Sequence, residues 1–313
     1  MLLKNCVHSK FVALFPCVNL STQLQPCIKG RTRNFVAHRA LYSGKYGENT
    51  FAAIQDCVES GVPQIEIDLQ ILNDEKFVLF HDFELDRLTN AKGLISNRDT
   101  AYISSILYKT GEPIALLDDI LPLLLNSSLR VHLDLKISNY PSSVIGKLAK
   151  KILPLKDRMV IASQDYQLLE MFTDHGFTVA FDTSRELRYQ PNRPPGKNPV
   201  GLGLHGLWDD SFEAYDTSIS TPQYIRYRLQ SFSNLMPLNA WVFDADTLDF
   251  LTSKSPTFSR DLAQQGIDLI TWGLDDTRES DLAKRLHCLF DIGVATVITD
   301  FPEKLASYAL NNL

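Results

Sequence analysis

The sequence predicts an α/β protein in which eight parallel strands form a barrel with helices on the outside. Short runs rich in Val, Ile, Leu and Phe alternate with longer runs in which apolar residues recur at helical spacing. Eight strand-like runs can be counted, which is the number that closes a (β/α)8 TIM barrel. The length of 313 residues suits one such barrel of ~250 residues with insertions.

The eight predicted strands are short apolar runs, several of which end in a charged residue or a histidine. They span residues 34–39, 65–71, 130–136, 159–163, 178–182, 239–245, 269–273 and 296–300. Catalytic side chains of parallel α/β proteins converge at the carboxyl ends of strands. We therefore expect the polar residues that end these runs to lie close together.

The predicted helices fill the intervals between the strands. Phe51, Ile54 and Val58 have helical spacing, and Gly61 ends that run. In the same way, Gly176 ends a later helical run. The predicted helices span residues 48–60, 117–126, 142–153, 166–175, about 259–265 and 280–292.

Two segments interrupt this alternation. Residues 83–112 form a small insertion after strand two, in which turn-forming residues predict loops and no barrel element. Residues 184–237 form a long excursion between strands five and six, with a helix predicted around 222–230. We expect this excursion to lie over the open end of the barrel, where its aromatic side chains would contact the leaving group of a substrate, including a choline-like one. These aromatic residues are Trp208, Phe212, Tyr215, Tyr224, Tyr227 and Phe232.

The N-terminal segment differs in composition from the rest. The first 47 residues contain no Asp or Glu but several Lys and Arg. We expect residues 1–33 to be a poorly ordered basic leader and residues 34–313 to be the barrel domain. The apolar patch at 11–20 is interrupted by Pro16, so it is short for a secretory signal, although a secreted or organellar leader stays an alternative.

Composition limits the partners. The net charge of -6 argues against a nucleic-acid platform but not against a small phosphorylated substrate. No apolar run is long enough to span a bilayer. Five cysteines without zinc-type spacing predict reduced thiols and favour a cytoplasmic location. The oligomeric state is left open.

Three carboxylates predict a metal site. Glu66 and Asp68 lie two residues apart on strand two and therefore point the same way. Asp134 lies near the end of strand three. Carboxylate oxygens are the natural ligands of hard divalent cations, so we expect Mg²⁺ or Ca²⁺ here.

Histidines and cations surround the predicted metal ligands. His38 and His81 each follow a strand and are the candidates for general acid and base, because imidazole titrates near neutral pH. Which of them is the acid is left open. Lys136 faces the same side as Asp134, and both Lys136 and Arg39 could contact a phosphate.

Five separated blocks resemble the glycerophosphodiester phosphodiesterase family in order and spacing. They are His38-Arg39, Glu48 to Thr50, Glu66-x-Asp68, His81-Asp82 and Leu85 to Thr89. The resemblance implies a TIM barrel whose insertion roofs the site. It also implies a divalent metal and hydrolysis of glycerophosphodiesters to an alcohol and glycerol 3-phosphate. Finally, it implies phosphate contacts for Arg39 and Lys136, and a place for Trp272 over the glycerol or phosphate.

The chain departs from the family pattern at three places. Asp134 stands where the family has Glu, Ala40 stands where it has Gly, and Gly273 to Asp275 replace Thr-Val-Asn. Two alternatives are kept. The same kind of site can cut bulkier head groups, which allows a phospholipase-D-like phosphodiesterase acting on a lysophospholipid or sphingolipid. The departures at Asp134 and Ala40 allow an inactive barrel that binds a phosphorylated ligand. Glu48 begins a predicted helix, so we expect it to cap that helix and not to bind the metal.

Overall fold

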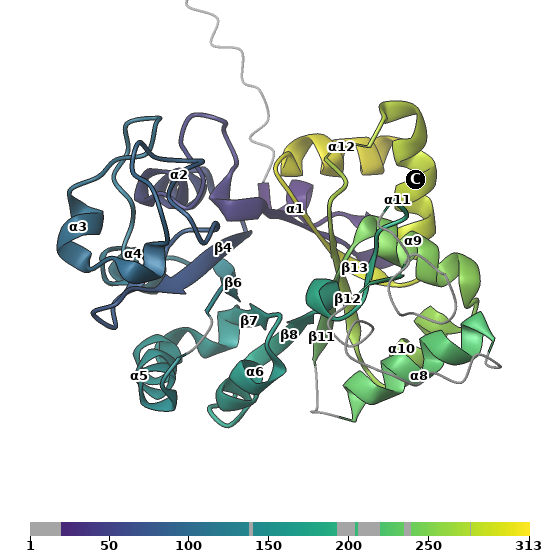
Figure 1. Ribbon diagram of the computed structural model, residues 1–313. Helices are drawn as coiled ribbons and strands as arrows, with labels where there is room; N and C mark the ends of the chain where they lie inside the picture. The colour runs from purple at the N-terminus through teal and green to yellow at the C-terminus, as the bar shows by residue number, and fades with distance from the viewer. Residues whose placement is uncertain (1–19, 138–139, 193–203, 206–219, 235–238, 276) are drawn as a thin grey trace, which may run out of the picture.

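The computed structural model describes residues 20–137, 140–192, 204–205, 220–234, 239–275 and 277–313. Eight parallel strands form a closed barrel, as the sequence predicts (Figure 1). Around the ring they are β3 (Asn34–Ala37), β4 (Gln64–Ile71), β6 (Arg130–Leu135), β7 (Met159–Ser163), β8 (Thr178–Asp182), β11 (Ala240–Asp244), β12 (Asp268–Trp272) and β13 (Val294–Thr299). Pairing of β3 with both β13 and β4 closes the ring.

Helices cover the outside of the barrel (Figure 1). The main ones are α2 (Phe51–Ser60), α4 (Leu117–Leu125), α5 (Ser142–Ile152), α6 (Tyr166–Thr173), α8 (Thr221–Ser233), α9 (Ala245–Lys254), α10 (Phe258–Gln264), α11 (Glu279–Asp291) and α12 (Pro302–Asn312). All helices expected from periodicity are present. Two further helices are not expected from the sequence pattern: α9, which begins directly after β11 on an Asp244 cap, and α12, which begins at Pro302.

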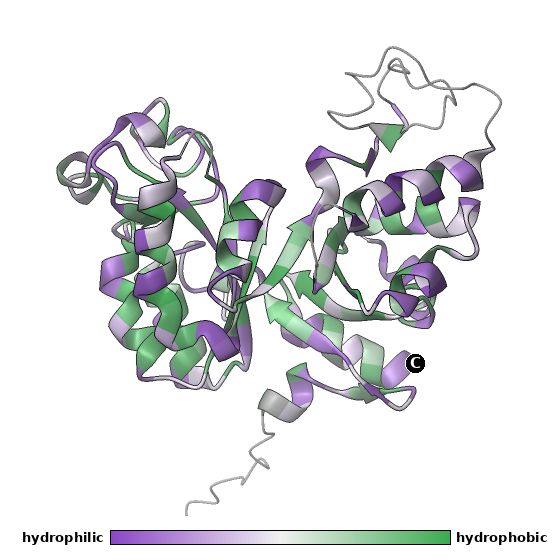
Figure 2. Ribbon diagram, turned by 90° about the horizontal axis from the view of Figure 1, so that it is seen from below, coloured by the Kyte–Doolittle hydropathy of each residue, from purple (hydrophilic) through white to green (hydrophobic). Residues whose placement is uncertain are grey.

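The core is divided between the outside and the inside of the barrel. Large side chains such as Trp241 and Phe243 are fully buried in the main cluster that the helices share with the strands. A separate cluster of strand residues contains small ones, such as Ala162, Ala180 and Ala240. Figure 2 shows hydrophobic residues concentrated on the strands and on one side of several helices. The small cluster leaves room for a deep pocket at the carboxyl ends of the strands.

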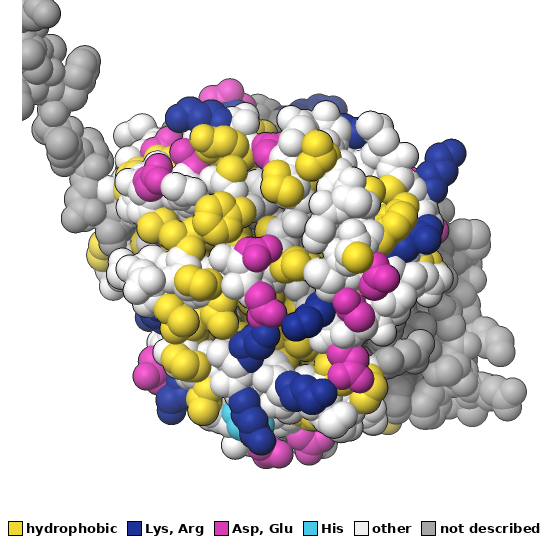
Figure 3. Space-filling model, turned by 90° about the vertical axis from the view of Figure 1, so that its left-hand side faces the viewer, with side chains coloured by type: hydrophobic (Ala, Val, Ile, Leu, Met, Phe, Trp, Pro, Cys, Tyr) yellow, Lys and Arg dark blue, Asp and Glu magenta, His cyan; other side chains and the backbone are white. Residues whose placement is uncertain are grey.

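The insertion forms a small subdomain of its own. β4 continues past the barrel and pairs antiparallel with β5 (Phe77–Leu79). The rest contains the 3-10 helix η2 (Ile95–Asn97) and the short helix α3 (Thr100–Ser104). A second apolar cluster holds it together: Leu72, Val78, Phe80, Leu85, Ile95, Ile103, Tyr108 and Ile114. Phe83, Leu94 and Leu107 remain exposed on it, and Figure 3 shows hydrophobic side chains between charged ones on this side of the molecule.

The described part of the expected leader lies against the barrel. Residues 1–19 lie outside the described residues, and the next segment forms α1 (Leu20–Leu24), β1 (Cys27–Ile28) and β2 (Arg31–Thr32). Leu24 and Ile28 are buried in the main core, and the Gln23 amide donates to Ser307 Oγ on α12. The boundary at residue 33 stays a prediction.

The excursion after β8 is only partly described. It contains the 3-10 helix η4 (Thr183–Arg185), β9 (Arg188–Tyr189), β10 (Leu204–His205) and the expected helix α8. Tyr224 and Phe232 are buried in the core, where the Phe232 ring contacts Phe181 and Trp241. The expectation that these two rings cover the open end is therefore wrong, because helical spacing turns them inward. Trp208, Phe212 and Tyr215 lie outside the described residues.

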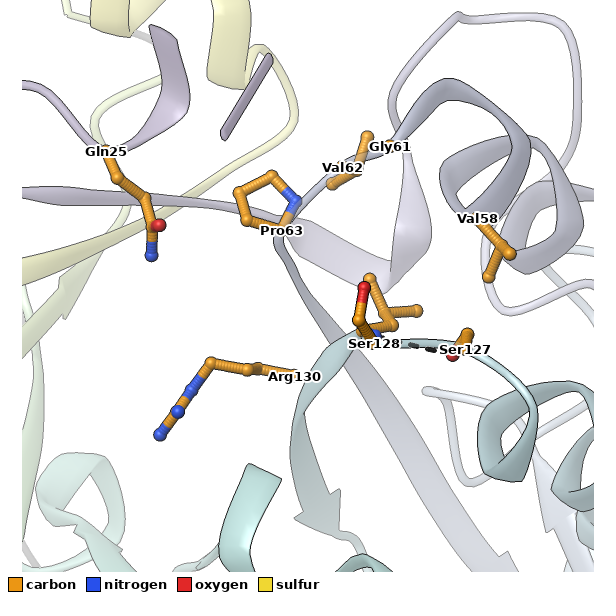
Figure 4. A pocket seen from close by; sticks show the side chains of 9 residues that line it. Gln25, Val58, Gly61, Val62, Pro63, Ser127, Ser128 and Arg130 are labelled. Carbon is orange, nitrogen blue, oxygen red and sulfur yellow. Dashed lines mark hydrogen bonds between the residues drawn. The ribbon is translucent and has the colours of Figure 1, made fainter. Parts of the chain in front are cut away.

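The opposite, amino-terminal end of the barrel has a separate cavity of about 440 Å³. The segments that precede β4 and β6 line it, together with Gln25, and the side chains of Gln25 and Arg130 point into the same space (Figure 4). Its lining residues include no acidic residue and no histidine. Within the part of the chain that the structure describes, no helix combines the length and apolar character needed to cross a bilayer.

Candidate active site

The register between β4 and β6 brings the three predicted metal ligands together. Asp68 is paired with Asp134 across the two strands, and Glu66 lies two residues before Asp68 and is paired with His132. Alternation along a strand turns all three side chains to the same face. One carboxylate oxygen from each residue lies within 4.8 Å of the others. These three residues, Glu66, Asp68 and Asp134, are called the acid triad. Glu66 and Asp68 are 4% and 1% exposed, and the Asp134 side chain is 16% exposed.

The charges of the acid triad indicate that a cation fits there. Burial and the neighbouring Asp68 raise the pKa of Glu66 to about 8. Burial also raises the pKa of Asp134 to about 6, although Lys136 opposes this shift. Asp134 Oδ1 is buried and accepts no hydrogen bond from the described residues. A divalent cation would relieve the mutual repulsion and give this oxygen a partner.

Asn49 holds Asp68 in place. Its Nδ2 donates to Asp68 Oδ2 at 2.8 Å, and its Oδ1 accepts from the Asp68 backbone N–H at 3.0 Å. Asn49 is fully buried and has a φ of 58°, a left-handed conformation that Asn tolerates better than most residues. This role of Asn49 does not follow from the sequence pattern, because its contact with Asp68 spans 19 positions.

Replacing Asn49 with alanine is expected to lower the free energy of unfolding by about 3 kcal/mol. The change removes two buried hydrogen bonds from Asp68 and puts alanine in a left-handed conformation. Urea denaturation checks this, with the exposed Asn311→Ala on α12 as the control. A loss for Asn49→Ala no larger than that of the control would contradict the assigned role.

Glu48 does not cap the helix that follows it. Thr50 is the N-cap of α2, and its hydroxyl accepts from the Ala53 N–H. Glu48 instead accepts hydrogen bonds from Arg39 at 2.9 Å and from Arg87 at 2.7 Å. The expectation of capping is therefore wrong, because the helix begins later than periodicity alone suggests.

Each histidine is anchored through Nδ1 by a carboxylate. His38 Nδ1 lies 2.7 Å from Asp300 Oδ1, and His81 Nδ1 lies 2.7 Å from Asp82 Oδ1. With the proton on Nδ1, each ring keeps Nε2 free to exchange a proton. His38 Nε2 lies 3.9 Å from Glu66 Oε2, so this imidazole borders the acid triad.

The two imidazoles have opposite pKa shifts. Burial lowers the pKa of His38, but the hydrogen bond to Asp300 and the charge of Glu66 outweigh it, so the pKa is raised. Burial lowers the pKa of His81, and the hydrogen bond to Asp82 does not reverse the shift. Burial raises the pKa of Asp82, yet the hydrogen bonds from Arg87 and His81 dominate and lower it to about 2. Asp82 is thus an ionised anchor at neutral pH.

Two cations flank the acid triad. Lys136 Nζ donates to Asp134 Oδ2 at 2.5 Å and lies 3.7 Å from Asp68 Oδ1. Burial disfavours its charge, but the charges of Asp134 and Asp68 raise the pKa well above its ordinary value. Arg39 donates its backbone N–H to Glu66 Oε2 at 2.8 Å, and its Nε lies 3.7 Å from Asp68 Oδ2.

All the site residues predicted from the sequence line one pocket of about 940 Å³. They are His38, Arg39, Glu66, Asp68, His81, Asp134, Lys136 and Trp272. Residues without a predicted role share this pocket, and they come from the insertion and from the segments after β7 and β8. Among these residues are Phe83, Leu94, Gln164, Ser184, Arg185 and Arg188. Their signal in the sequence is weak, because loop residues carry no periodicity.

Two of the departures from the family pattern, Ala40 and Asp275, lie in defined local surroundings. Ala40 is buried with a φ of 59°, which glycine would adopt without strain. Asp275 accepts hydrogen bonds from Thr299 Oγ1 and the Asp300 N–H. Asp275 therefore helps to shape the segment that positions Asp300, the partner of His38.

Known proteins are similar in sequence to the part of the chain that contains the site. The family model for the glycerophosphoryl diester phosphodiesterase family matches residues 38–152. The chain is 31% identical over 147 residues to a glycerophosphodiester phosphodiesterase of Bacillus altitudinis, a match covering 44% of this chain and 60% of that protein. It is 25% identical over 305 residues to human lysophospholipase D GDPD1, covering 88% of this chain and 86% of that protein. The matches to the first two curated relatives span 60% and 59% of those relatives' lengths.

Solved structures share the fold. A phosphodiesterase of Oleispira antarctica, solved in complex with the product sn-glycerol-3-phosphate, superposes with a TM-score of 0.58 at 17% identity, covering 88% of this chain and 95% of that one. A glycerophosphodiester phosphodiesterase of Parabacteroides distasonis gives a TM-score of 0.59 at 16% identity, with coverages of 88% and 96%. The family model spans both histidines and the complete acid triad. Residues 38–152 are therefore similar in sequence to the glycerophosphoryl diester phosphodiesterase family, and the similarity to solved structures shows the TIM-barrel fold.

Proposed function

We propose that this protein hydrolyses glycerophosphodiesters to an alcohol and sn-glycerol 3-phosphate. One observation carries the proposal: two carboxylate-anchored histidines, two cations and an acid triad line a single pocket at the carboxyl ends of the barrel strands. Phosphodiester hydrolysis needs these three kinds of group, to move protons, to bind phosphate and to stabilise negative charge.

Glu66, Asp68 and Asp134 would hold a divalent cation, Mg²⁺ or Ca²⁺. Hard oxygen ligands and the unpartnered Asp134 Oδ1 support this assignment. When bound, such an ion stabilises the negative charge that develops on the phosphoryl oxygens.

Arg39 and Lys136 would orient the phosphate. The backbone N–H of Arg39 is committed to Glu66, and its guanidinium is held by Glu48. Lys136 reaches over the acid triad, where its ammonium can turn from Asp134 to a phosphate oxygen. Trp272 lines the same pocket and would contact the glycerol or phosphate of the substrate.

His38 and His81 would move the protons. The Nε2 atom of one imidazole accepts a proton from the attacking oxygen. The other imidazole donates a proton to the departing alcohol. Asp300 and Asp82 hold the two rings through Nδ1, so that Nε2 is the nitrogen that exchanges protons. Their anchoring also fixes the ring orientation, which positioned catalysis requires.

A specific observation favours lysophospholipids as a second class of substrate. Phe83 and Leu94 are 57% and 43% exposed, and both line the pocket on the side of the insertion. An apolar lip of this kind can cover an acyl chain that glycerophosphodiesters lack. The likeness to human lysophospholipase D GDPD1 supports this candidate.

Release of glycerol 3-phosphate tests the proposal. The protein with Mg²⁺ or Ca²⁺ is expected to release it from glycerophosphoglycerol, measured with coupled glycerol-3-phosphate dehydrogenase. Lysophosphatidylcholine is assayed in parallel by mass spectrometry of lysophosphatidic acid, and a sphingolipid substrate by mass spectrometry of its phosphorylated product. Binding of a diester by calorimetry without turnover of any substrate would overturn the proposal and support the inactive-barrel alternative.

A further inference from the structure

The pocket has a second polar wall opposite the acid triad. In the closed ring, β8 and β11 lie across the barrel from β3 and β4. The segment after β8 places Arg185 and Arg188 in the pocket, and we call these two residues the arginine wall. The proposed chemistry uses neither of them.

Arg188 covers the aromatic face on this side. Its guanidinium carbon lies 5.5 Å from the centre of the Trp272 ring, and its Nε lies 3.8 Å from Asp244 Oδ2. A quaternary ammonium group is normally held against an aromatic face. Here the Arg188 guanidinium already occupies this position, so the Trp272 ring is not open to a quaternary ammonium group.

The carboxylates near the arginine wall are engaged elsewhere. Asp244 is buried and accepts from the backbone N–H and hydroxyl of Thr247. Asp182 is also buried and accepts from the Gln164 amide at 3.0 Å and the Ser184 N–H at 2.9 Å. These hydrogen bonds hold both carboxylates to the protein chain.

The guanidinium groups are more open than these acids. The Arg185 and Arg188 side chains are 46% and 41% exposed, whereas the acidic partners Glu186 and Asp244 are 17% and 10% exposed at the side chain. A group that enters this half of the pocket therefore meets N–H donors before it meets carboxylate oxygens. The Ser184 hydroxyl and the Gln164 amide line the same half.

The pocket is large enough for the leaving alcohol to bind in the half that contains the arginine wall. The acid triad, both histidines and Lys136 come from β4 and β6 and from the segments that follow β3, β5 and β6, so the phosphate is handled on that side. A pocket of about 940 Å³ is large for a phosphodiester with a small alcohol. Space therefore remains beside the arginine wall.

We propose that the arginine wall binds the leaving alcohol and selects polyol or anionic head groups over quaternary ammonium head groups. This inference rests on the proposed function, which defines the leaving alcohol. Guanidinium groups donate well-directed hydrogen bonds to hydroxyl, carboxylate and phosphate oxygens, and they repel a fixed positive charge.

Three diesters that differ in the charge of the leaving alcohol test the inference. They are glycerophosphoglycolate (anionic), glycerophosphoglycerol (neutral) and glycerophosphocholine (cationic). The kcat/KM of the wild-type protein is expected to be roughly tenfold higher for each of the first two than for the third. Arg188→Gln and Arg185→Gln are expected to lower this ratio several-fold through KM, while the exposed Arg260→Gln on α10 keeps it.

The outcomes separate this inference from the proposed function. A wild-type preference for glycerophosphocholine, or a ratio unchanged in both arginine variants, overturns the arginine wall and leaves the hydrolase intact. If no diester is hydrolysed, the proposed function fails, and the dissociation constants of the same diesters by calorimetry decide the inference. Equal constants for the three overturn it. Thermal melts of both variants show whether a loss reflects folding.

Discussion

Replacing either His38 or His81 by alanine is expected to lower turnover by a factor on the order of 10²–10⁴, the usual contribution of a general acid or base. Both rings are held through Nδ1 by a carboxylate and line the pocket of the acid triad. The loss should fall on kcat more than on KM, because proton transfer occurs in the transition state. In the double variant, the combined loss should be far smaller than the product of the single losses, because the two groups act in one reaction.

His175→Ala is the matched control, because His175 follows α6 and does not line the pocket. Its turnover should equal that of the wild type. Circular dichroism should show the same fold for all four proteins. If His38→Ala or His81→Ala turned over like the control, that histidine would have no part in the proposed reaction.

Exhaustive chelation is expected to abolish turnover, and added Mg²⁺ or Ca²⁺ to restore it. Stabilisation of phosphoryl charge by a metal contributes several kcal/mol, so a loss of roughly 10³-fold is expected. Asp134→Glu should be as active as the wild type or more active, because Glu is the residue that the glycerophosphodiester phosphodiesterase family normally has at this position. Glu66→Gln and Asp68→Asn should abolish both turnover and metal binding.

A readout that does not depend on turnover separates metal binding from other effects. An ion that binds the native state alone raises the Tm by mass action, and the three ligand variants should differ from the wild type in this shift. Glu170→Gln on α6 serves as the control, because Glu170 is exposed and far along the chain from the acid triad. Full turnover by thoroughly chelated protein would remove the metal from the mechanism.

The parts of the fold that depend on local patterns were predictable. All eight barrel strands follow from apolar runs, and α8 was expected within a few residues of its observed position. Elements that begin without an intervening loop were not predicted. α9 starts at Ala245 directly after β11, so its pattern merges with that of the strand.

Some residues of the candidate site could be predicted from the sequence and others could not. Glu66, Asp68 and Asp134 could be chosen because alternation and strand order put them on one face. Asp300 could not be chosen as the partner of His38, because the two residues are 262 positions apart in the sequence. Only the closed ring, in which β13 returns to β3, brings the two together.

The aromatic residues of the excursion show where composition misleads. Many aromatic residues in a segment between two strands suggested a surface that contacts ligand. In fact Tyr224 and Phe232 face the core, because that part of the segment is a helix. Burial is decided by which face of an element meets its neighbours, and composition does not carry this information.

The separate apolar cluster of the insertion lies beside one of the two histidines that are proposed to move protons. His38 follows β3 of the barrel, whereas His81 follows β5, beside the insertion cluster that includes Val78 and Phe80. Local opening of the insertion is expected to displace the His81 imidazole before the barrel unfolds, because the barrel keeps its own core. Under the proposed mechanism, activity is therefore expected to be lost on heating at a lower temperature than the barrel structure.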